Sequence, residues 1–264
     1  MKKKTKMIVT DIRFLADGIC SMTLRYPEGE APAEVKPGQF AGLYPNDASM
    51  LLPRPISICR WDPERGELRF VFRTAGAGTM SLAAQKTGDT VDVLGILGNG
   101  YDLSELAGKR VLLLGGGIGV PPMLELAACL SKEPGTEVTA VMGYRDSDMF
   151  LTEELGECAR LLIATEDGSA GTKGNVLDAV RENGVTADVL CACGPMPMLR
   201  AVKKYAREKG IPAYLSLEER MACGVGACLG CVTKTAKTDS HSHVKNARIC
   251  TEGPVFKAEE VEIG

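Results

Sequence analysis

The stretch LLLGGGIGVPPM, residues 112–123, joins an apolar run to a helical pattern through a glycine-rich turn. The apolar run is continuous from about residue 109, as expected for a strand buried on both faces of a sheet. The two prolines suit the first turn of a helix. Backbone amides of such a turn can approach a pyrophosphate, and the helix dipole favours that anion. The glycines are Gly115, Gly116, Gly117 and Gly119. Because their spacing is not G-x-G-x-x-G, a tight turn without a ligand is the alternative to dinucleotide binding.

Alternating strand and helix patterns continue after this turn. Short apolar runs predict strands, and apolar residues at helical spacing predict helices. The strands are expected at 109–116, 136–144, 160–165, 187–194 and 212–218, and the helices at 120–132, 175–183 and 195–210. This alternation predicts a Rossmann-like α/β domain, in which helices cover both faces of a parallel sheet.

A second turn, CACGPMPML at residues 191–199, follows a later strand of the same predicted sheet. Cys193, Gly194 and Pro195 end that strand and open a helix. Ligands of such sheets bind at the carboxyl ends of the strands, so this turn is expected to face the same crevice as the first turn. Taken alone, Cys193 is as readily explained as a small buried side chain.

The first hundred residues have a different pattern, in which short strand-like runs alternate with turn-forming residues. The runs are 7–15, 19–26, 39–45, 55–61, 67–74 and 90–97, and residues 77–85 are expected to form one helical turn. This pattern predicts a small antiparallel β-barrel. We therefore divide the chain into a barrel at 1–100, the α/β domain at 101–217 and a cysteine-rich segment at 218–264.

Two stretches of the barrel contain candidate cofactor-binding residues. In LLPRPISICR, residues 51–60, Arg54 suits a pyrophosphate and the Ser57 hydroxyl suits a flavin ring nitrogen. The stretch AGAGTMS, residues 75–81, places a second glycine turn before a short helix. A surface arginine, a turn serine and a tight turn explain each of these features equally well when it is taken alone.

The segment MACGVGACLGC, residues 221–231, concentrates cysteines and glycines. Cys223, Cys228 and Cys231 are spaced C-x4-C-x2-C, and eighteen residues separate Cys231 from Cys250. This is the spacing of a plant-type [2Fe–2S] cluster with four cysteine ligands. The intervening glycines let the loop fold tightly, with backbone amides turned toward the sulfurs.

Two other metal sites compete with this interpretation. Structural zinc more often uses two C-x2-C pairs, and this segment has only one. A Rieske centre needs histidines beside its cysteines. The chain's two histidines, His241 and His243, lie in the polar stretch TDSHSHVKN, where solvation is the simpler explanation. Residues 234–243 are expected to form a hairpin extension between the third and fourth cysteines.

Length, charge and composition exclude other classes of function. The chain has 264 residues and a net charge of −3, which argues against a nucleic-acid surface. Its apolar runs are too short to span a bilayer, and the basic N-terminus continues as a strand rather than a signal peptide. We therefore expect a cytoplasmic protein whose cysteines stay reduced. Outside the cluster motif, most cysteines should pack as small hydrophobic side chains. They are Cys20, Cys59, Cys129, Cys158, Cys191 and Cys193.

Together these motifs resemble the ferredoxin–NADP reductase superfamily, followed by a C-terminal [2Fe–2S] segment. Over nearly its whole length the chain is most similar to the iron–sulfur electron-transfer subunits of class 1B, NAD-linked dihydroorotate dehydrogenases. The segment ERMACGVGACLGC resembles that family's cluster loop almost residue for residue. The stretch RICTEGPVF resembles the context of the fourth cluster ligand.

The resemblance implies three cofactors: FAD, NAD and a [2Fe–2S] cluster. It assigns the nicotinamide nucleotide to GGGIGVPP and CGPMPM, and FAD to RPISI and VFRTAGAGT. The implied FAD contacts are Arg54, Pro55, Ile56, Ser57, Val71, Phe72, Arg73, Gly78 and Thr79. No separate catalytic base is implied, because electron transfer needs none.

The resemblance also implies a path for electrons. A nicotinamide exchanges two electrons at once, a [2Fe–2S] cluster exchanges one, and a flavin can do both, so FAD is expected between them. The outside partner would be an FMN-bearing subunit that oxidises dihydroorotate in pyrimidine (UMP) biosynthesis, in a heterotetramer with two copies of each subunit. Asp146 favours NAD over NADP because it would repel a 2′-phosphate, although Arg145 beside it opposes that effect.

Two other functions fit part of the sequence. One is an NAD(P)H-dependent flavin and iron–sulfur reductase subunit of another complex, linked to sulfide or ferredoxin. The other is a zinc-stapled, flavin-binding module without redox activity.

Overall fold

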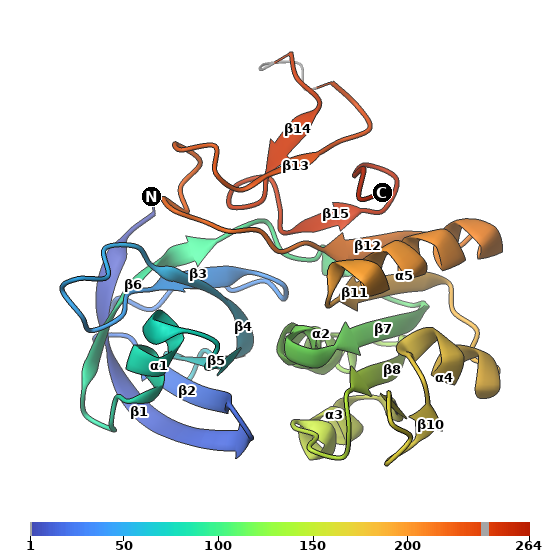
Figure 1. Ribbon diagram of the computed structural model, residues 1–264, viewed down its shortest axis with the longest axis horizontal. Coiled ribbons are helices and arrows are strands. Elements are labelled where there is room, and N and C mark those ends of the chain that lie inside the picture. Colours follow the sequence, from blue (N-terminus) through green and yellow to red (C-terminus); the bar gives the residue numbers. More distant parts are fainter. Residues whose placement is uncertain (1, 239–242) are drawn as a thin grey trace.

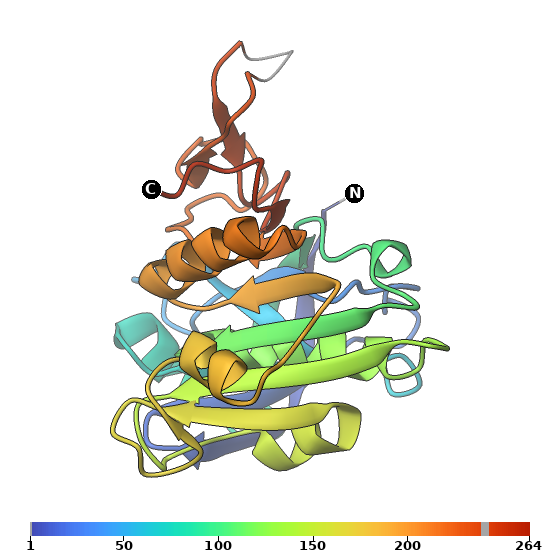
Figure 2. The same ribbon diagram turned by 90° about the vertical axis from the view of Figure 1, so that its right-hand side faces the viewer.

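The computed structural model describes residues 2–238 and 243–264. A closed β-barrel and an α/β domain lie side by side, and the C-terminal segment runs over the top of both (Figure 1). A view turned by 90° shows the strands of the α/β sheet stacked below the C-terminal segment (Figure 2). His241 lies outside the described residues. Within them, no helix is long and apolar enough to cross a membrane.

The barrel is antiparallel and has the strand order β1-β2-β5-β4-β3-β6. Its strands are β1 Lys4–Ala16, β2 Ile19–Arg25, β3 Phe40–Leu43, β4 Arg54–Asp62, β5 Glu67–Arg73 and β6 Thr90–Leu97. Alternate side chains point inward, so Met7 and Val9 of β1 are fully buried whereas Lys6 and Ile8 are exposed. Helix α1 (Ala77–Ala83) lies between β5 and β6 in sequence. The predicted barrel and its helical turn are confirmed.

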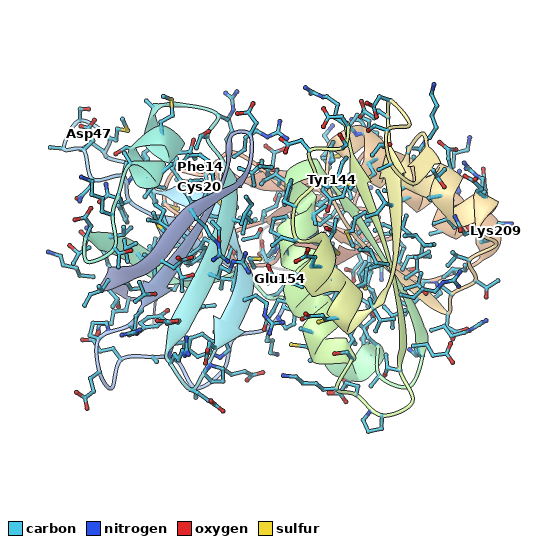
Figure 3. All side chains as sticks on the ribbon, turned by 90° about the horizontal axis from the view of Figure 1, so that it is seen from below. Phe14, Cys20, Asp47, Tyr144, Glu154 and Lys209 are labelled. Carbon is cyan, nitrogen blue, oxygen red and sulfur yellow. The ribbon has the colours of Figure 1, made fainter. Side chains whose placement is uncertain are left out.

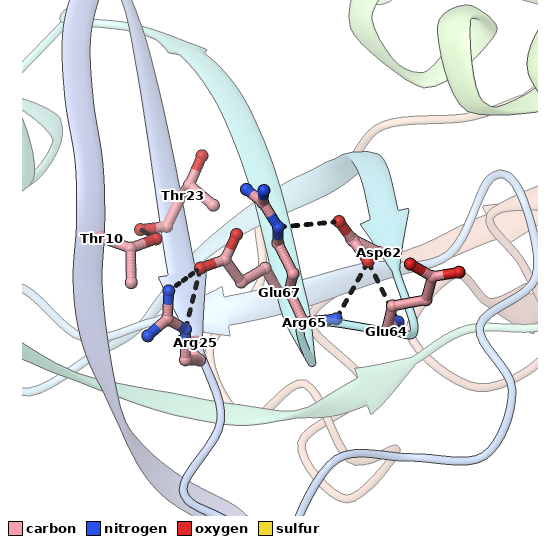
Figure 4. A network of polar contacts seen from close by, with 7 residues as sticks. All are labelled: Thr10, Thr23, Arg25, Asp62, Glu64, Arg65 and Glu67. Atoms are coloured by element: carbon pink, nitrogen blue, oxygen red, sulfur yellow. Dashed lines mark hydrogen bonds and ion pairs between the residues drawn. The ribbon is translucent and has the colours of Figure 1, made fainter.

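Charged side chains fix the register at one end of the barrel (Figure 4). Arg25 and Glu67 are paired across β2 and β5, and Arg25 Nη2 lies 2.6 Å from Glu67 Oε1. In the turn between β4 and β5, Asp62 Oδ1 accepts hydrogen bonds from the backbone N–H groups of Glu64 and Arg65, both at 3.0 Å. The ion pair stabilises the pairing of β2 with β5, and the Asp62 hydrogen bonds stabilise the β4–β5 turn.

The α/β domain contains a sheet with the order β10-β9-β8-β7-β11-β12-β15. All of these strands are parallel except β15. The strands from this domain are β7 Arg110–Gly116, β8 Glu137–Tyr144, β9 Arg160–Thr165, β10 Thr172–Lys173, β11 Val189–Cys193 and β12 Ala213–Ser216. The helices are η1 Leu103–Glu105, η2 Gly117–Gly119, α2 Val120–Leu130, α3 Thr152–Cys158, α4 Val176–Glu182 and α5 Met196–Lys209. The predicted parallel sheet is confirmed, and its central strand β7 is buried throughout after Arg110.

Helix α3 is missing from the sequence-based prediction. It has only seven residues, which is too short to show a helical period. Its start is set by Leu151, a buried residue with φ 63°. Tyr144 donates a hydrogen bond to the carbonyl of Phe150 at 2.7 Å and packs edge-on against its ring. Tertiary contacts therefore decide where this helix begins.

The C-terminal segment is attached to the α/β domain by a strand. Strands β13 (Val232–Lys234) and β14 (Asn246–Arg248) pair antiparallel, which confirms the predicted hairpin. Strand β15 (Val255–Lys257) pairs antiparallel with β12 at the edge of the parallel sheet. The boundaries at 100 and 217 remain predictions from the sequence, and the sheet continues across the second of them.

Buried acidic side chains join the α/β domain to the barrel. Glu125 of α2 is 5% exposed, accepts a hydrogen bond from the backbone N–H of Trp61 at 3.2 Å and lies 3.6 Å from Arg60. Burial raises the pKa of Glu125, and Arg60 opposes that rise. Arg69 Nη1 lies 2.6 Å from Glu154 Oε2 of α3, at the junction seen from below in Figure 3. The two domains thus share one polar seam.

Candidate functional site

The two predicted nucleotide turns touch each other. A Cβ atom on Gly119 would lie 2.3 Å from the carbonyl oxygen of Cys193 and 2.6 Å from the backbone nitrogen of Gly194. A Cβ atom on Gly116 would lie 2.6 Å from Met198 Sδ and 3.2 Å from Pro195. Gly119 therefore excludes any side chain, because the atoms it would meet belong to the backbone, whereas at Gly116 the flexible Met198 side chain would have to move. The two turns thus lie against each other at the carboxyl edge of the sheet.

Cys193 ends β11 at the carboxyl edge of the sheet, between Gly115 of β7 and Ser216 of β12. It is only partly exposed. Burial raises the pKa of its thiol to about 12, and a hydrogen bond with Ser216 opposes that rise. At neutral pH the Cys193 side chain is therefore an uncharged thiol at the carboxyl edge of the sheet.

Arg54 and the turn before α1 lie against each other, although they are far apart in sequence. A Cβ atom on Gly78 would lie 2.2 Å from Arg54 Nε, so the guanidinium covers that glycine closely. Arg54 Nη1 donates to the carbonyl of Leu52 at 2.8 Å. Thr79 Oγ1 accepts hydrogen bonds from the backbone N–H groups of Ala75, at 3.0 Å, and Gly76, at 3.3 Å. A cation and a closed glycine turn therefore form one surface suited to a phosphate.

The other predicted FAD residues occupy two barrel strands. Pro55, Ile56 and Ser57 begin β4, are partly exposed and pair with β3. Val71 and Phe72 are 3% and 2% exposed, so their side chains belong to the hydrophobic core. Arg73, by contrast, is exposed at the end of β5.

Arg73 also reaches the other domain. Its Nη2 atom lies 4.0 Å from the place that a Cβ atom on Gly117 would occupy. The end of the barrel strand and the first nucleotide turn are therefore neighbours. The predicted FAD surface and the predicted nicotinamide surface thus meet at the junction of the two domains.

The first two cysteines of the cluster motif lie in one loop, where Cys223 is half-buried and Cys228 is exposed. Cys223 Sγ accepts hydrogen bonds from the backbone N–H groups of Val225 and Cys228, both at 3.4 Å, and Cys228 Sγ accepts one from Gly230 at 3.4 Å. Positive φ angles at Gly224 (65°) and Gly226 (87°) turn the loop backbone inward. Burial opposes ionisation, but the backbone hydrogen bonds outweigh it and lower the pKa of Cys223 to about 6.

The last two cysteines form a buried pair. Cys231 is 2% and Cys250 is 1% exposed, and the two side chains lie close together. The backbone N–H of Ile249 donates to the carbonyl of Cys231 at 2.9 Å, which ties the two chain segments together. Burial and the neighbouring Cys231 raise the pKa of Cys250 to about 11.

The two pairs lie next to each other. Cys223 and the backbone of Gly226 are both close enough to the Cys250 thiol to affect its pKa. Within residues 2–238 and 243–264, no three Cys, His, Asp or Glu side chains converge on one metal-binding point. Two adjacent pairs of cysteine sulfurs, with backbone amides turned toward them, fit the ligand set of a two-iron cluster that takes two cysteines per iron.

No sequence pattern points to Asn99, which fastens this region to the barrel. Its backbone N–H donates to the carbonyl of Gly253 at 2.7 Å, and its side-chain amide donates to the carbonyls of Glu252 and Val255. The glycines that flank it in LGNGY are the only local hint of a special conformation. Asn99 holds the connection between barrel and sheet against the segment that follows Cys250.

Comparison with known families assigns the two C-terminal parts of the chain. Residues 218–262 match the family described as the iron-sulfur cluster binding domain of dihydroorotate dehydrogenase B. Residues 113–204 match the oxidoreductase NAD-binding domain. These ranges contain all four paired cysteines and both nucleotide turns.

Curated relatives match along the whole chain. A protein from Geobacillus sp. is 43% identical over 265 residues, covering 99% of this chain and 99% of its own length. A protein from Bacillus caldolyticus is 43% identical over 262 residues, covering 98% of each. Both are named dihydroorotate dehydrogenase B (NAD(+)), electron transfer subunit. This chain belongs to that family.

The dihydroorotate dehydrogenase B family assignment agrees with the fold. A structure described as NADH-dependent reduced ferredoxin-NADP oxidoreductase, from work on flavin-based electron bifurcation, superposes with a TM-score of 0.85 at 29% identity. It covers 97% of this chain and 89% of its own. A flavohemoglobin from Malassezia yamatoensis shares the fold over 79% of this chain and 57% of its own, with a TM-score of 0.67 at 21% identity.

The chain is thus an oxidoreductase subunit that combines a flavin-reductase fold, an NAD-binding domain and a [2Fe–2S] segment. The resemblance stated from the sequence is confirmed, and so are the three cofactors, FAD, NAD and [2Fe–2S]. An electron transfer subunit has a catalytic partner. The two curated relatives that match along the whole chain are named neither as a sulfide- or ferredoxin-linked reductase nor as a zinc-stapled module.

Proposed function

We propose that this chain carries electrons from an FMN-bearing dihydroorotate dehydrogenase subunit to NAD+ in pyrimidine biosynthesis. The full-length similarity to electron transfer subunits, with all four cysteines inside the matched iron–sulfur segment, is the observation that carries the proposal. We further propose that the complex is a cytoplasmic heterotetramer with two copies of each subunit. None of the ten cysteines of this chain is in a disulfide bond, which suits a reducing compartment.

The barrel is proposed to hold FAD. Arg54 and the turn at Gly78 and Thr79 bind the pyrophosphate, because a guanidinium forms charge-assisted hydrogen bonds to phosphate oxygens. Pro55, Ile56 and Ser57 line the ring through the partly exposed start of β4. Val71 and Phe72 contribute backbone groups, since their side chains are in the core. Arg73 spans the gap between the barrel and the nicotinamide turn.

The α/β domain is proposed to hold NAD at the carboxyl edge of β7 and β11. Gly115, Gly116, Gly117 and Gly119 keep the first turn free of side chains where the dinucleotide approaches the backbone. Cys193, Gly194 and Pro195 form the facing turn. The Cys193 thiol is uncharged, so it does not repel the negatively charged nucleotide. Asp146 follows β8 at the same edge, where a carboxylate would repel the 2′-phosphate of NADP.

The C-terminal segment is proposed to hold the [2Fe–2S] cluster on Cys223, Cys228, Cys231 and Cys250. A bound flavin exchanges electrons both singly and in pairs, which links a one-electron cluster to a two-electron nicotinamide. The protein's task is to fix these groups in order and to shield them. The buried pair, Cys231 and Cys250, lies on the side of the protein core, whereas Cys223 is half-buried and Cys228 is exposed to solvent.

The cluster loop is also the proposed contact with the catalytic subunit. Val225 and Leu229 are 41% and 61% exposed, which is unusual for apolar side chains that flank a redox centre. Leu229 has φ 56°, so the backbone itself turns that residue away from the loop interior. Met221 packs partly against the core instead. The partner is therefore expected to cover Val225 and Leu229.

Reconstitution tests this function. The isolated chain, loaded with its cofactors, should reduce artificial electron acceptors with NADH and should not oxidise dihydroorotate. Addition of the FMN-bearing subunit should produce NAD+-dependent dihydroorotate oxidation, with orotate and NADH formed in equal amounts. Oxidation of dihydroorotate by this chain alone, with no second protein detectable by mass spectrometry, would overturn the proposal.

A further inference from the structure

Thr251, which directly follows the fourth cysteine, has an unusual hydroxyl group. Its Oγ1 atom is shielded from solvent and has no hydrogen-bond partner among residues 2–238 and 243–264. Shielded hydroxyl groups in folded proteins are nearly always hydrogen-bonded, because an unpaired one loses its bonds to water without replacement. A partner outside the polypeptide would remove this conflict.

The position of Thr251 identifies that partner. Its backbone N–H donates to the carbonyl of Arg248 at 3.1 Å, which fixes the residue in the turn that presents Cys250. A Cβ atom on Gly226 would lie 2.8 Å from Thr251 Cγ2 and 3.5 Å from Thr251 Oγ1. Gly226 lies between Cys223 and Cys228 in the loop, so Thr251 faces the stretch that joins these two cysteines. The hydroxyl is therefore held where the cluster loop closes on the fourth cysteine.

We infer that the Thr251 hydroxyl donates a hydrogen bond to a sulfur atom of the [2Fe–2S] cluster and raises the cluster's reduction potential. The inference rests on the proposed set of four cysteine ligands. Hydrogen bonds to cluster sulfurs stabilise the reduced state more than the oxidised state, because reduction adds negative charge that the sulfurs share. Thr251 is thus a positioning and tuning residue, since it carries no electron itself.

The consequence concerns the direction of electron flow. A cluster with a higher potential accepts an electron more readily from the catalytic subunit and releases it less readily to the flavin. Loss of the Thr251 hydroxyl should therefore make the cluster harder to reduce, while its iron content stays the same. A hydroxyl with only a structural role would leave the potential where it is.

The test is a redox titration of the full-length protein with its cofactors bound, followed by EPR of the reduced cluster. Thr251→Val keeps the shape of the side chain and removes the hydroxyl. At the midpoint potential of the wild type, the ratio of reduced to oxidised cluster should fall about three-fold, which is about 28 mV for a one-electron couple at 59 mV per tenfold change. Thr251→Ser, which retains a hydroxyl, should keep the ratio near that of the wild type.

A control and a second variant complete the experiment. Thr235 belongs to the hairpin of the same segment, and its hydroxyl donates to the carbonyl of Lys237 at 2.9 Å, so Thr235→Val should leave the potential unchanged. If Thr251→Val does not load a cluster, Thr251→Ala, which relieves the contact with Gly226, takes its place and should show the same negative shift.

The outcomes separate this inference from the proposed function. An unchanged potential in a fully loaded Thr251→Val or Thr251→Ala protein overturns the inference and leaves the four ligands standing. A higher melting temperature of Thr251→Val with no change in potential would show that the hydroxyl is simply unpaired. Wild-type protein without iron and acid-labile sulfide would instead refute the ligand assignment.

Discussion

Different kinds of contact fix the structure at the nucleotide turns and in the cluster loop. The nucleotide turns touch so closely that a Cβ atom on Gly119 would meet the Cys193 carbonyl at 2.3 Å. In the cluster loop, Cys228 is exposed, and the loop's own amides are the closest groups to the first two sulfurs. One region is fixed by packing between strands, and the other by bonds within a short loop.

The difference indicates which region needs its bound cofactor in order to fold. Packing of the sheet and barrel is present whether or not a nucleotide is bound, so the nucleotide turns are shaped in advance. The loop presents the four proposed ligands, and metal binding is coupled to folding in such segments. The two regions should therefore fail separately when each is altered, and the predictions below test that separation.

The largest expected effect is loss of the cluster alone. Cys231→Ser or Cys228→Ser should abolish the visible iron–sulfur absorption and the bound iron, because each removes one of the four proposed ligands. FAD content should stay nearly complete, since the barrel does not use these residues. Cys158→Ser, a change at a partly exposed thiol outside the motif, is the matched control. Unchanged iron and acid-labile sulfide in both variants would show the ligand assignment to be wrong.

A substitution in the barrel should cause loss of FAD and leave the iron–sulfur cluster bound. Arg54→Ala removes a charge-assisted contact to the pyrophosphate, which is worth about 1.5–3 kcal/mol, so the Kd for FAD should rise roughly 10- to 100-fold. Ser57→Ala removes no charge and should keep FAD bound. The measurement is flavin fluorescence released on dialysis, with iron assayed in parallel. A dialysed Arg54→Ala protein with full flavin content contradicts the phosphate role.

A smaller effect is expected at the surface of the cluster loop. Leu229→Glu should weaken assembly with the catalytic subunit about tenfold, because it places a charge where an apolar contact is expected. NADH-driven reduction of artificial acceptors should not change. Val244, another exposed apolar residue but one in the hairpin, supplies the control Val244→Glu. Equal reconstituted rates for Leu229→Glu and the wild type would place the interface elsewhere.

The finest comparison is between the two cysteine pairs in protein stripped of its cluster. Backbone hydrogen bonds lower the pKa of Cys223 from 9.0 to about 6, whereas burial raises that of Cys250 to about 11. Cys223 should therefore stabilise the folded loop above pH 9.0 and lose that contribution as the pH falls through about 6. Cys250 should stabilise it below pH 9.0 and lose that contribution as the pH rises through about 11.

Alkylation measured residue by residue with mass spectrometry checks this prediction. The rate at Cys223 should follow a thiolate that forms near pH 6, and Cys250 should remain unmodified at neutral pH. A midpoint near pH 9 at Cys223 would show that the loop amides do not hold its thiolate in the absence of the cluster.

Much of the fold is readable from local patterns. The alternation of inward and outward residues in the barrel strands and the continuous apolar run of β7 both survive in the structure, because they reflect burial on one face or on both. Helix α3 was not predicted because its seven residues carry no period and its start depends on buried Leu151. Strand β15 also escapes prediction, because it exists only as an edge partner of β12.

The sequence by itself determined the types of ligand and their spacing. Cysteines at C-x4-C-x2-C and glycines between a strand and a helix restrict the chemistry before any fold is known, because metal ligation and phosphate binding need those groups on short loops. The tertiary structure alone decided which distant residues meet. It placed Arg54 on Gly78, Arg73 beside Gly117 and Thr251 against Gly226. Such contacts depend on how strands and loops pack in space, which no local pattern records.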